Sequence, residues 1–261
     1  RTIHGGQENT DPAYGSVMPP IYQTSTYKQS TPGGHKGYEY SRSGNPTRAA
    51  LERSLASLEN GNFGLAFGSG LAAIDAVLKL FKTGDEIIST NDLYGGSYRL
   101  FTKIFENFGI RFHLVNMKNV NDIEQYINEN TKLIWVETPT NPMMNIIDIE
   151  AMSRIAKKHN LLLAVDNTFA TPYLQQPLEL GADIVMHSAT KYLGGHSDLT
   201  AGAALGPAQL ISELDDWRRQ LGQAPSPETA DLLGRSLATL ELRMQRHNAN
   251  ALELAQRLAE H

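Results

Sequence analysis

The 261-residue chain has no cysteine and no excess of positive charge. Disulfides, iron–sulfur clusters and thiolate zinc sites are therefore excluded, and the composition fits a reducing compartment such as the cytoplasm. The formal net charge is −5, so no surface is expected to attract nucleic acid or anionic membrane. The longest apolar runs, such as residues 161–165, are far shorter than a membrane span. These absences favour a soluble enzyme or binding domain.

Several familiar catalytic motifs are also missing. The sequence contains no H-E-x-x-H, no G-x-x-x-x-G-K-[ST] and no G-x-S-x-G. Its eight histidines are scattered along the chain, which gives no pattern typical of a metal site. Metal hydrolysis, P-loop chemistry and the serine-hydrolase elbow are therefore not indicated.

Short apolar runs alternate with helical patterns through the middle of the chain. Strands are expected near residues 63–67, 86–89, 112–115, 133–136, 161–165 and 184–187. Helices are expected around 46–58, 70–81, 98–108, 122–129, 149–159 and 174–180. Apolar runs without alternation are typical of strands covered on both faces. The sequence therefore predicts an α/β fold with a mostly parallel sheet flanked by helices.

The two ends of the chain differ from this middle part. Residues 1–37 are rich in proline, glycine, serine and threonine, and we expect an arm that lies on a neighbouring subunit. Residues 38–225 form the expected α/β domain. Residues 226–261 begin with a helix start signal, Ser226-Pro227-Glu228, and predict one long helix that leads toward a further domain.

Three candidate strand ends carry groups suited to binding a ligand. Gly68-Ser69-Gly70 precedes a helix and is either an anion site or a tight turn that needs glycine. Asp166 directly follows a buried strand, where a carboxylate must face a crevice or be paired, although it could also cap a helix. Ser188-Ala189-Thr190-Lys191 places an amine between hydroxyls and later glycines, which makes Lys191 a candidate Schiff-base lysine.

Together these groups describe a pyridoxal 5′-phosphate site. The Lys191 amine would bond the cofactor aldehyde, and Asp166 would hold the pyridine nitrogen protonated. The phosphate would rest on the Gly-Ser-Gly turn and the hydroxyls, and Tyr94 could stack on the ring. A rival interpretation is a dinucleotide site, because residues 68–73 match G-x-G-x-x-A and Asp92 follows at a suitable distance. The dinucleotide interpretation assigns no role to Asp166 or to residues 188–191.

Four ordered segments identify a family resemblance: 40–47 (YSRSGNPT), 137–142 (ETPTNP), 165–168 (VDNT) and 188–191 (SATK). Through essentially its whole length, the chain resembles the Cys/Met-metabolism pyridoxal-phosphate enzymes, which include cystathionine γ-lyase, cystathionine γ-synthase and methionine γ-lyase. The resemblance implies a type I aminotransferase-like fold and a homotetramer built from two tight dimers. It also implies a small sulfur amino acid as substrate.

The resemblance also implies roles for individual residues. Lys191 is the Schiff-base lysine, Asp166 partners the ring nitrogen and Tyr94 stacks on the ring and assists proton transfer. The phosphate pocket is lined by Ser69, Gly70, Leu71, Ser188 and Thr190. Tyr40 and Arg42 reach the phosphate from the neighbouring subunit, and Asn141 contacts the substrate carboxylate.

Within the family, the cystathionine branch is favoured. Methionine γ-lyases typically carry a cysteine in the segment matching residues 94–97, where this chain has Gly96. Glu39 matches an acidic position of cystathionine-cleaving relatives and could pair with the distal ammonium of the substrate. The expected reaction is γ-elimination of cystathionine, and γ-replacement by a synthase stays an alternative. Family members continue through a C-terminal domain that carries an arginine for the substrate carboxylate, and we expect this chain to lead into that domain.

Overall fold

The computed structural model describes residues 3, 5 and 13–261. The remaining part of the expected arm, residues 1, 2, 4 and 6–12, lies outside the described residues. The strands are β1 (Phe63–Phe67), β2 (Glu86–Thr90), β3 (Arg111–Val115), β4 (Thr131–Glu137), β5 (Leu162–Asp166), β6 (Ile184–His187) and β7 (Gly202–Gly206). The helices are α1 (Pro46–Leu58), α2 (Gly70–Leu78), α3 (Gly95–Lys103), α4 (Ile149–Lys158), α5 (Thr171–Leu174), α6 (Ala208–Leu221), α7 (Pro227–Leu237) and α8 (Leu240–Ala259), with two 3₁₀ segments, η1 (Phe105–Phe108) and η2 (Val120–Tyr126).

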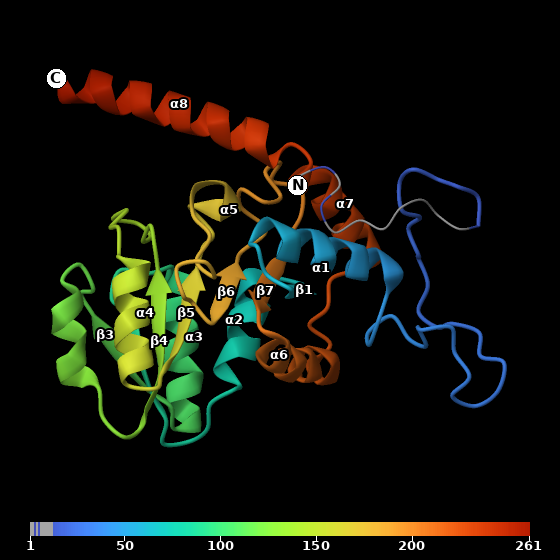
Figure 1. The fold of residues 1–261 in the computed structure, drawn as a ribbon, viewed down its shortest axis with the longest axis horizontal. Coiled ribbons are helices and arrows are strands. Elements are labelled where there is room, and N and C mark those ends of the chain that lie inside the picture. The colour runs from blue at the N-terminus through green and yellow to red at the C-terminus, as the bar shows by residue number, and fades with distance from the viewer. Residues whose placement is uncertain (1–2, 4, 6–12) are drawn as a thin grey trace.

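The strands form one seven-stranded sheet in the order β1-β7-β6-β5-β4-β2-β3 (Figure 1). Strands β2 to β6 are parallel where they pair, and β7 runs antiparallel to both β1 and β6. The carboxyl ends of β1, β2, β4, β5 and β6 therefore meet at one edge, together with the amino end of β7. The expected α/β fold with a mostly parallel sheet is confirmed, and each of the six expected strands is present.

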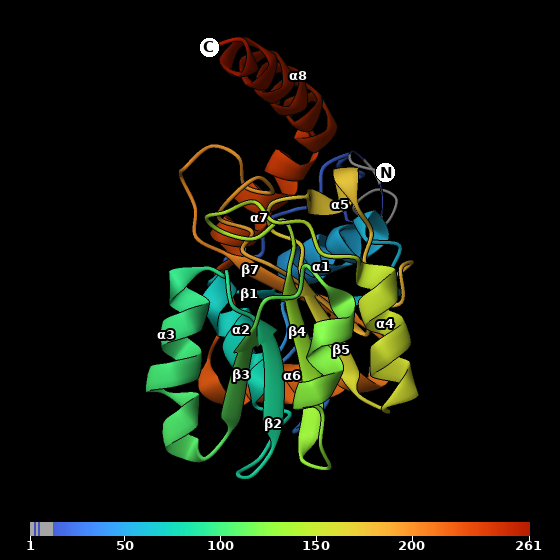
Figure 2. The ribbon, with the colours of Figure 1, turned by 90° about the vertical axis from the view of Figure 1, so that its left-hand side faces the viewer.

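Helices cover both faces of the sheet. Figure 2 shows α3 and α4 on opposite sides of it. Successive residues of β4 point to opposite faces: the side chain of Trp135 packs with α2, α3 and α6, whereas Ile134 and Val136 pack with α4. All three are fully buried. A strand covered on both faces needs apolar residues at every position, which is why the sequence showed runs without alternation.

Side-chain caps begin the helices that lead to the site. The Asn45 side chain accepts hydrogen bonds from the backbone N–H groups of Thr47 and Arg48, and Pro46 occupies the first helical position of α1. The Ser69 hydroxyl accepts from Ala72 N–H and caps α2 at 3.1 Å. Such caps satisfy N–H groups that have no partner inside the helix.

Strand β7 packs against the turn between β1 and α2. A Cβ atom on Gly202 would overlap the carbonyl group of Ser69, which is backbone and cannot rotate away. The next residue, Ala203, is fully buried. The small side chains of residues 201–204 let the two backbones approach closely, and this segment was missed as a strand because it contains almost no large apolar residue.

Replacing Gly202 with alanine is expected to lower the free energy of unfolding by about 1–3 kcal/mol, the usual cost of overpacking. The variant should also bind the expected cofactor, pyridoxal phosphate, more weakly, because the displaced Ser69–Gly70 turn lines a cavity. Urea unfolding and cofactor titration measure both effects. Gly234→Ala is the matched control: a Cβ there meets nothing within 4 Å in the middle of α7, so this variant should be as stable as the parent or more so. Equal stability of the two variants would contradict the packing argument.

Three expected helices differ from the structure. Residues 122–129 contribute to a 3₁₀ segment that ends at Tyr126, and only Leu174 of the expected 174–180 helix is helical, at the end of α5. The expected single helix over 226–261 is also wrong, because Ala238 and Thr239 separate α7 from α8. The carbonyl of Ser236, near the end of α7, accepts from the guanidinium of Arg243 at 2.9 Å and from the N–H of Thr239 at 3.3 Å, which caps the end of the helix.

Helix α7 belongs to the core of the α/β unit, since Leu233 and Leu237 pack with Leu51 and Leu55 of α1. Helix α8 then projects from the rest of the structure (Figure 1). Leu252, Leu254 and Leu258 on α8 are more than half exposed, so the large apolar side chains of this helix are not buried beyond Met244.

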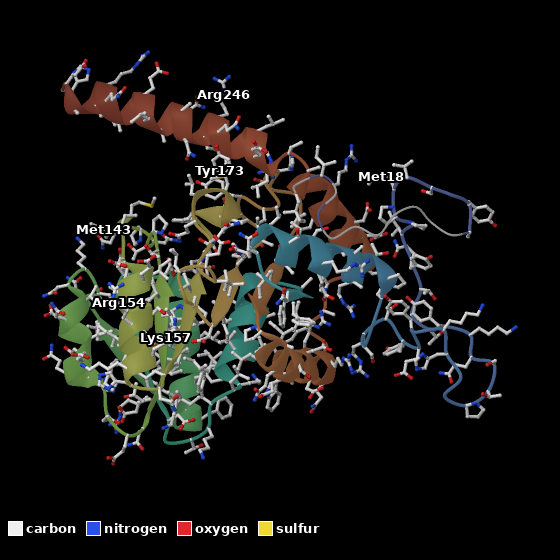
Figure 3. All side chains as sticks on the ribbon, viewed as in Figure 1. Met18, Met143, Arg154, Lys157, Tyr173 and Arg246 are labelled. Carbon is white, nitrogen blue, oxygen red and sulfur yellow. The ribbon has the colours of Figure 1, made fainter. Side chains whose placement is uncertain are left out.

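Residues 13–37 form an arm without helix or extended strand. An isolated bridge between Thr26 and Tyr40 joins it to the body, and the side chains of Asn45 and Thr47 also hydrogen-bond to the backbone of Tyr22. The arm extends away from the sheet in Figure 1, and Figure 3 shows Met18 on it. Tyr14 and Val17 are 95% and 78% exposed. An apolar surface of this kind is typical of a segment that covers another molecule.

Candidate active site

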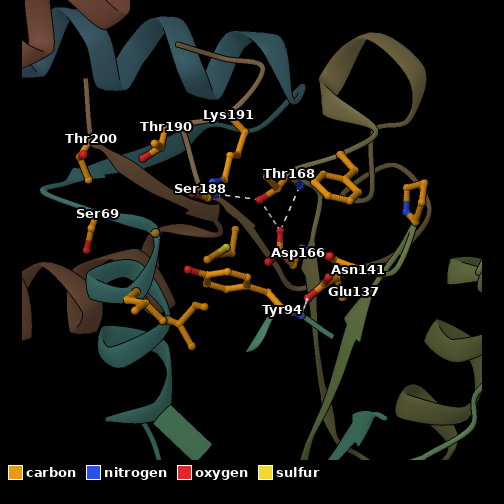
Figure 4. Close-up of a pocket in the computed structure, with 16 residues that line it drawn as sticks. Ser69, Tyr94, Glu137, Asn141, Asp166, Thr168, Ser188, Thr190, Lys191 and Thr200 are labelled. Atoms are coloured by element: carbon orange, nitrogen blue, oxygen red, sulfur yellow. Dashed lines mark hydrogen bonds between the residues drawn. The ribbon is translucent and has the colours of Figure 1, made fainter. Parts of the chain in front are cut away.

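A cavity of about 250 Å³ lies at the edge where the carboxyl ends of the parallel strands meet (Figure 4). This is the place at which open parallel sheets bind ligands. The cavity is lined by Ser69, Gly70, Leu71, Ile74, Tyr94, Glu137, Pro139, Asn141, Asp166, Thr168, Phe169, Met186, Ser188, Thr190, Lys191 and Thr200.

The structure brings together nine of the twelve residues expected at the site. They come from five strand ends: Ser69, Gly70 and Leu71 after β1, Tyr94 after β2, Asn141 after β4, Asp166 at the end of β5, and Ser188, Thr190 and Lys191 after β6. Glu39, Tyr40 and Arg42 do not line the cavity. Sequence analysis gave no role to Glu137, Thr168 and Thr200, which do line it.

One side of the cavity is suited to an anion. Ser69 and Gly70 form the N-terminus of α2, where unpaired N–H groups and the helix dipole favour negative charge. A Cβ on Gly70 would lie 2.8 Å from the Cβ of Ser188, so only glycine fits this contact between the two strand ends. The hydroxyl-bearing residues Ser188, Thr190 and Thr200 line the cavity nearby. These donors fit the phosphate of pyridoxal phosphate.

The carboxyl group of Asp166 lies in the middle of the cavity lining and is buried at the end of β5. Its Oδ1 atom accepts hydrogen bonds from the N–H and the hydroxyl of Thr168. Burial raises the pKa of Asp166 above its ordinary value, against the opposing effect of these two hydrogen bonds. A buried carboxyl group with a raised pKa is costly to ionise without a cationic partner, and a protonated ring nitrogen is such a partner.

Glu137 is a second buried carboxyl group beside Asp166. The two residues are register partners on β4 and β5, and Glu137 is only 5% exposed. Burial, followed by the nearby negative charge of Asp166, raises the pKa of Glu137 to about 8. Its Oε2 atom accepts a hydrogen bond of 2.9 Å from Tyr94 N–H. The rule that strand ends carry site residues could have found Glu137, which ends β4.

The raised pKa of Glu137 predicts a pH-dependent stability for the cofactor-free protein. Between its ordinary pKa of 4.5 and its folded pKa of about 8, the folded protein binds a proton that the unfolded chain has released. The free energy of unfolding should therefore fall as pH rises through this window, and Asp166 contributes in the same direction. Denaturant unfolding at several pH values should give a shallower decline for Glu137→Gln. Equal slopes in both proteins would show that Glu137 is ionised throughout.

A buried network of polar side chains holds the residues at the carboxyl ends of β5 and β6 in place. Glu59, at the end of α1, accepts from the side-chain amide of Asn167 at 2.8 Å and lies 2.6 Å from Nε2 of His187. Gln175 donates to the Asn167 side chain and to the carbonyl of Thr138. Asn167 and His187 directly follow Asp166 and precede Ser188, so this network holds the backbone on which the site residues stand.

Lys191 lies on a turn that is fixed at both ends. The Thr190 hydroxyl hydrogen-bonds to the carbonyl and the N–H of Ala201, directly before β7. On the other side, the Arg243 guanidinium of α8 donates to the carbonyls of Tyr192 and Leu193. Figure 4 shows Lys191 extending toward the cavity from this turn.

Glu39, Tyr40 and Arg42 lie on the segment that joins the arm to α1, outside the cavity lining. The Arg42 guanidinium stands over the Tyr40 ring at 5.3 Å and donates to the carbonyl of Arg219. The Arg48 guanidinium donates a hydrogen bond of 2.7 Å to the Ser41 carbonyl. Glu39 and Tyr40 are exposed.

The geometry does not support the dinucleotide interpretation. In a dinucleotide fold the glycine-rich turn joins two neighbouring parallel strands. Here the turn at 68–70 follows β1, and four other strands separate β1 from β2. Asp92 also has another task, since its carboxylate accepts from the Thr140 hydroxyl and the Asn145 amide.

The comparisons with known proteins identify the family. The family described as Cys/Met metabolism PLP-dependent enzyme matches residues 1–261. The chain is 52% identical to a cystathionine β-lyase of Lactococcus lactis subsp. cremoris, over 98% of this chain and 67% of the relative. It is 50% identical to a cystathionine γ-lyase of Bacillus subtilis, over 99% of this chain and 68% of the relative.

Two solved structures are similar over the whole chain. MetB from Corynebacterium glutamicum superposes with a TM-score of 0.97 at 46% identity and is covered over 68% of its length. A cystathionine γ-lyase from Lactobacillus plantarum, complexed with L-serine, superposes with a TM-score of 0.96 at 45% identity, again over 68% of that chain.

The fold and the cavity are those of a pyridoxal-phosphate-dependent enzyme with the type I aminotransferase-like fold. The chain belongs to the family of Cys/Met metabolism PLP-dependent enzymes. Its cofactor is pyridoxal 5′-phosphate, and small amino acids fit the family as substrates. Among the described residues, no helix has the length and apolar character needed to cross a membrane.

Proposed function

We propose that the protein is a carbon–sulfur lyase of the cystathionine γ-lyase type. The observation that supports this most strongly is the convergence of Lys191, Asp166 and Tyr94 on one cavity beside the N-terminus of α2. The overall reaction would convert cystathionine and water to cysteine, 2-oxobutanoate and ammonia.

In this proposal each residue has a defined role. When bound, pyridoxal phosphate supplies an electron sink for the negative charge that develops at the substrate α-carbon. Lys191 Nζ attaches the cofactor, takes the α-proton and carries it within the pocket. The Asp166 carboxylate keeps a proton on the ring nitrogen, and the Tyr94 hydroxyl assists proton transfer while its ring stacks on the cofactor.

The remaining residues would bind the cofactor phosphate and the substrate. Ser69, Gly70, Leu71, Ser188 and Thr190 hold the phosphate, and Asn141 holds the α-carboxylate of the substrate. We propose that Tyr40 and Arg42 complete the phosphate pocket of a neighbouring subunit and that Glu39 binds the distal ammonium of cystathionine there. Their exposed positions outside this chain's own cavity fit that arrangement. The enzyme would then be a homotetramer of two tight dimers.

Gly96 supports the cystathionine branch over methionine γ-lyase. A Cβ at position 96 would overlap the ring of Tyr94 as it stands here. The position at which methionine γ-lyases typically carry a cysteine is therefore closed to a side chain by the present orientation of Tyr94.

A second candidate is cleavage at the other carbon–sulfur bond. Relatives from Lactococcus lactis at 51–52% identity are named cystathionine β-lyases. β-Cleavage would yield homocysteine, pyruvate and ammonia. A γ-synthase is the third possibility in the same pocket, because a relative from Bacillus subtilis at 49% identity is named cystathionine γ-synthase/O-acetylhomoserine (thiol)-lyase.

Product analysis distinguishes these reactions. The protein loaded with pyridoxal phosphate is incubated with cystathionine, and the oxo acid and the thiol are identified by mass spectrometry. Formation of 2-oxobutanoate and cysteine supports the γ-lyase, whereas pyruvate and homocysteine identify a β-lyase. Cystathionine formed from an O-acylated homoserine and cysteine, without breakdown of cystathionine, would identify a synthase and overturn the proposal.

A further inference from the structure

Two loops at the cavity carry the aromatic ring and the amide that the proposed function assigns to cofactor and substrate. Tyr94 stands on the loop between β2 and α3, and Asn141 on the loop between β4 and α4. Both side chains line the cavity, and Figure 4 shows them close to each other beside Glu137. The contacts that fix the distance between these two loops therefore determine whether the Tyr94 ring and the substrate ligand Asn141 keep their relative positions.

The second loop has little apolar anchoring of its own. Met143 and Ile146 are each 70% exposed, and Met144 is 56% exposed with a left-handed φ of 56°. Figure 3 shows Met143 at the tip of this loop. Since burial does not hold residues 142–146, polar contacts must do so.

Asp92 on the first loop reaches across to the second. Its Oδ2 atom accepts from the Thr140 hydroxyl, from Met143 N–H at 3.2 Å and from the Asn145 side-chain amide at 3.1 Å. Hydrogen bonds to an ionised acceptor are stronger than those between neutral groups. The Asp92 carboxylate thus binds three groups of the loop that carries Asn141.

Glu137, at the base of the second loop, reaches back to the first. Its carboxyl group accepts from Tyr94 N–H at 2.9 Å and also from the backbone of Asn141. The residue is buried, so these contacts are shielded from water. The charged groups that act on Glu137 are Asp166 on β5 and Asp92 on the first loop.

We propose that Asp92 and Glu137 are positioning residues that form a reciprocal clasp: each carboxyl group binds the opposite loop, and together they fix the separation between Tyr94 and Asn141. This inference rests on the proposed roles of Tyr94 and Asn141. The clasp holds the cofactor-stacking ring and the α-carboxylate ligand in one rigid frame. Displacements of about 1 Å in such a frame can cost about 10²-fold in rate.

The test is binding of L-alanine to the protein loaded with pyridoxal phosphate, followed by titration of the cofactor absorption band. L-Alanine carries the α-amino and α-carboxylate groups but no sulfur, so binding requires no carbon–sulfur cleavage. Asp92→Ala and Glu137→Ala should each raise the dissociation constant about tenfold or more. Each should also change the circular dichroism of the cofactor band, because the Tyr94 ring moves.

The conservative variants should show graded rescue. Asp92→Asn keeps one side-chain oxygen for the same three donors and should bind close to normally. Glu137→Gln keeps one of two acceptors and should lie between the parent and the alanine variant. The double variant Asp92→Ala/Glu137→Ala should be little worse than either single one, because both break the same connection.

Glu86→Gln is the matched control. Glu86 is also buried and hydrogen-bonded, to Asn128 and Arg111, but it begins β2 at the opposite edge of the sheet. It should lose stability without a change in L-alanine binding or in circular dichroism. The inference is overturned if the clasp variants bind L-alanine as Glu86→Gln does, or if the two single effects multiply.

If neither alanine variant folds, the graded order of Asp92→Asn and Glu137→Gln decides, and parental affinity in both would overturn the inference. A parent protein that binds L-alanine but leaves cystathionine intact would refute the proposed function alone.

Discussion

Replacing Lys191 with alanine is expected to abolish covalent attachment of the cofactor. In the parent protein, borohydride should fix pyridoxal phosphate irreversibly, and peptide mapping should locate the label on Lys191. In the variant the cofactor should be washed out by dialysis. Turnover should fall by at least about 10²- to 10⁴-fold, because the group that moves the α-proton is also lost.

Lys132→Ala serves as the control for Lys191→Ala. Lys132 is an exposed residue near the start of β4, at the edge opposite to the cavity. It should retain the label and the full rate. Because the Lys191 side chain is also exposed, its loss should leave the free energy of unfolding of the cofactor-free protein nearly unchanged. Persistent turnover in Lys191→Ala, or a label on another lysine, would refute the assignment.

The second large effect is expected for Asp166→Asn. The amide oxygen can still accept both hydrogen bonds from Thr168, so the strand end should keep its shape. What disappears is the negative charge opposite the ring nitrogen. Breaking a buried ion pair costs about 3–5 kcal/mol, which corresponds to a loss of about 10²- to 10⁴-fold in rate.

Stability separates this effect from misfolding. Since burial raises the pKa of Asp166, the carboxyl group is costly to ionise in the cofactor-free protein, and the neutral amide should be tolerated there. The cofactor-free variant should therefore unfold at the same denaturant concentration as the parent or a higher one at neutral pH. Cofactor binding and absorption should change at the same time. A rate within a few-fold of the parent would contradict the role of Asp166.

The expected strands were found because they are short, apolar and bounded by helical patterns. The sequence did not predict β7, because its residues Gly-Ala-Ala-Leu-Gly form no distinct hydrophobic run. Its two glycines are required by contacts with residues that are distant in the sequence: Gly202 lies against Ser69 and Gly70, and Gly206 against the carbonyl of Asp183. A local pattern cannot reveal a requirement that arises only when two distant backbones meet.

The site was predictable to the extent that its residues follow strands. Gly70, Asp166 and Lys191 were expected from the rule that parallel strands deliver ligands at their carboxyl ends. Glu137 satisfies the same rule, but its burial beside Asp166 appears only once the register of β4 and β5 is known. Thr200 was not accessible by this route, because it precedes an antiparallel strand and enters the cavity from the opposite direction.

The single helix expected over 226–261 failed for a different reason. No proline or glycine marks the break at Ala238 and Thr239, since the only glycine in that stretch, Gly234, lies within α7. The break is associated with Arg243, whose guanidinium donates to the Ser236 carbonyl as well as to the carbonyls of Tyr192 and Leu193. The signal is thus a tertiary contact with the turn that follows Lys191.

The antiparallel pairing of β1 with β7 affects when the protein can fold during its synthesis on the ribosome. Phe63 pairs with Gly206, so the strand that leads into the phosphate-binding turn gains its partner only after more than a hundred further residues have been synthesised. Contacts of such long sequence separation form late in folding. We therefore expect the phosphate-binding turn to be complete only after β7 has been synthesised. In shorter nascent chains β1 would lack the strand with which it pairs, which favours aggregation.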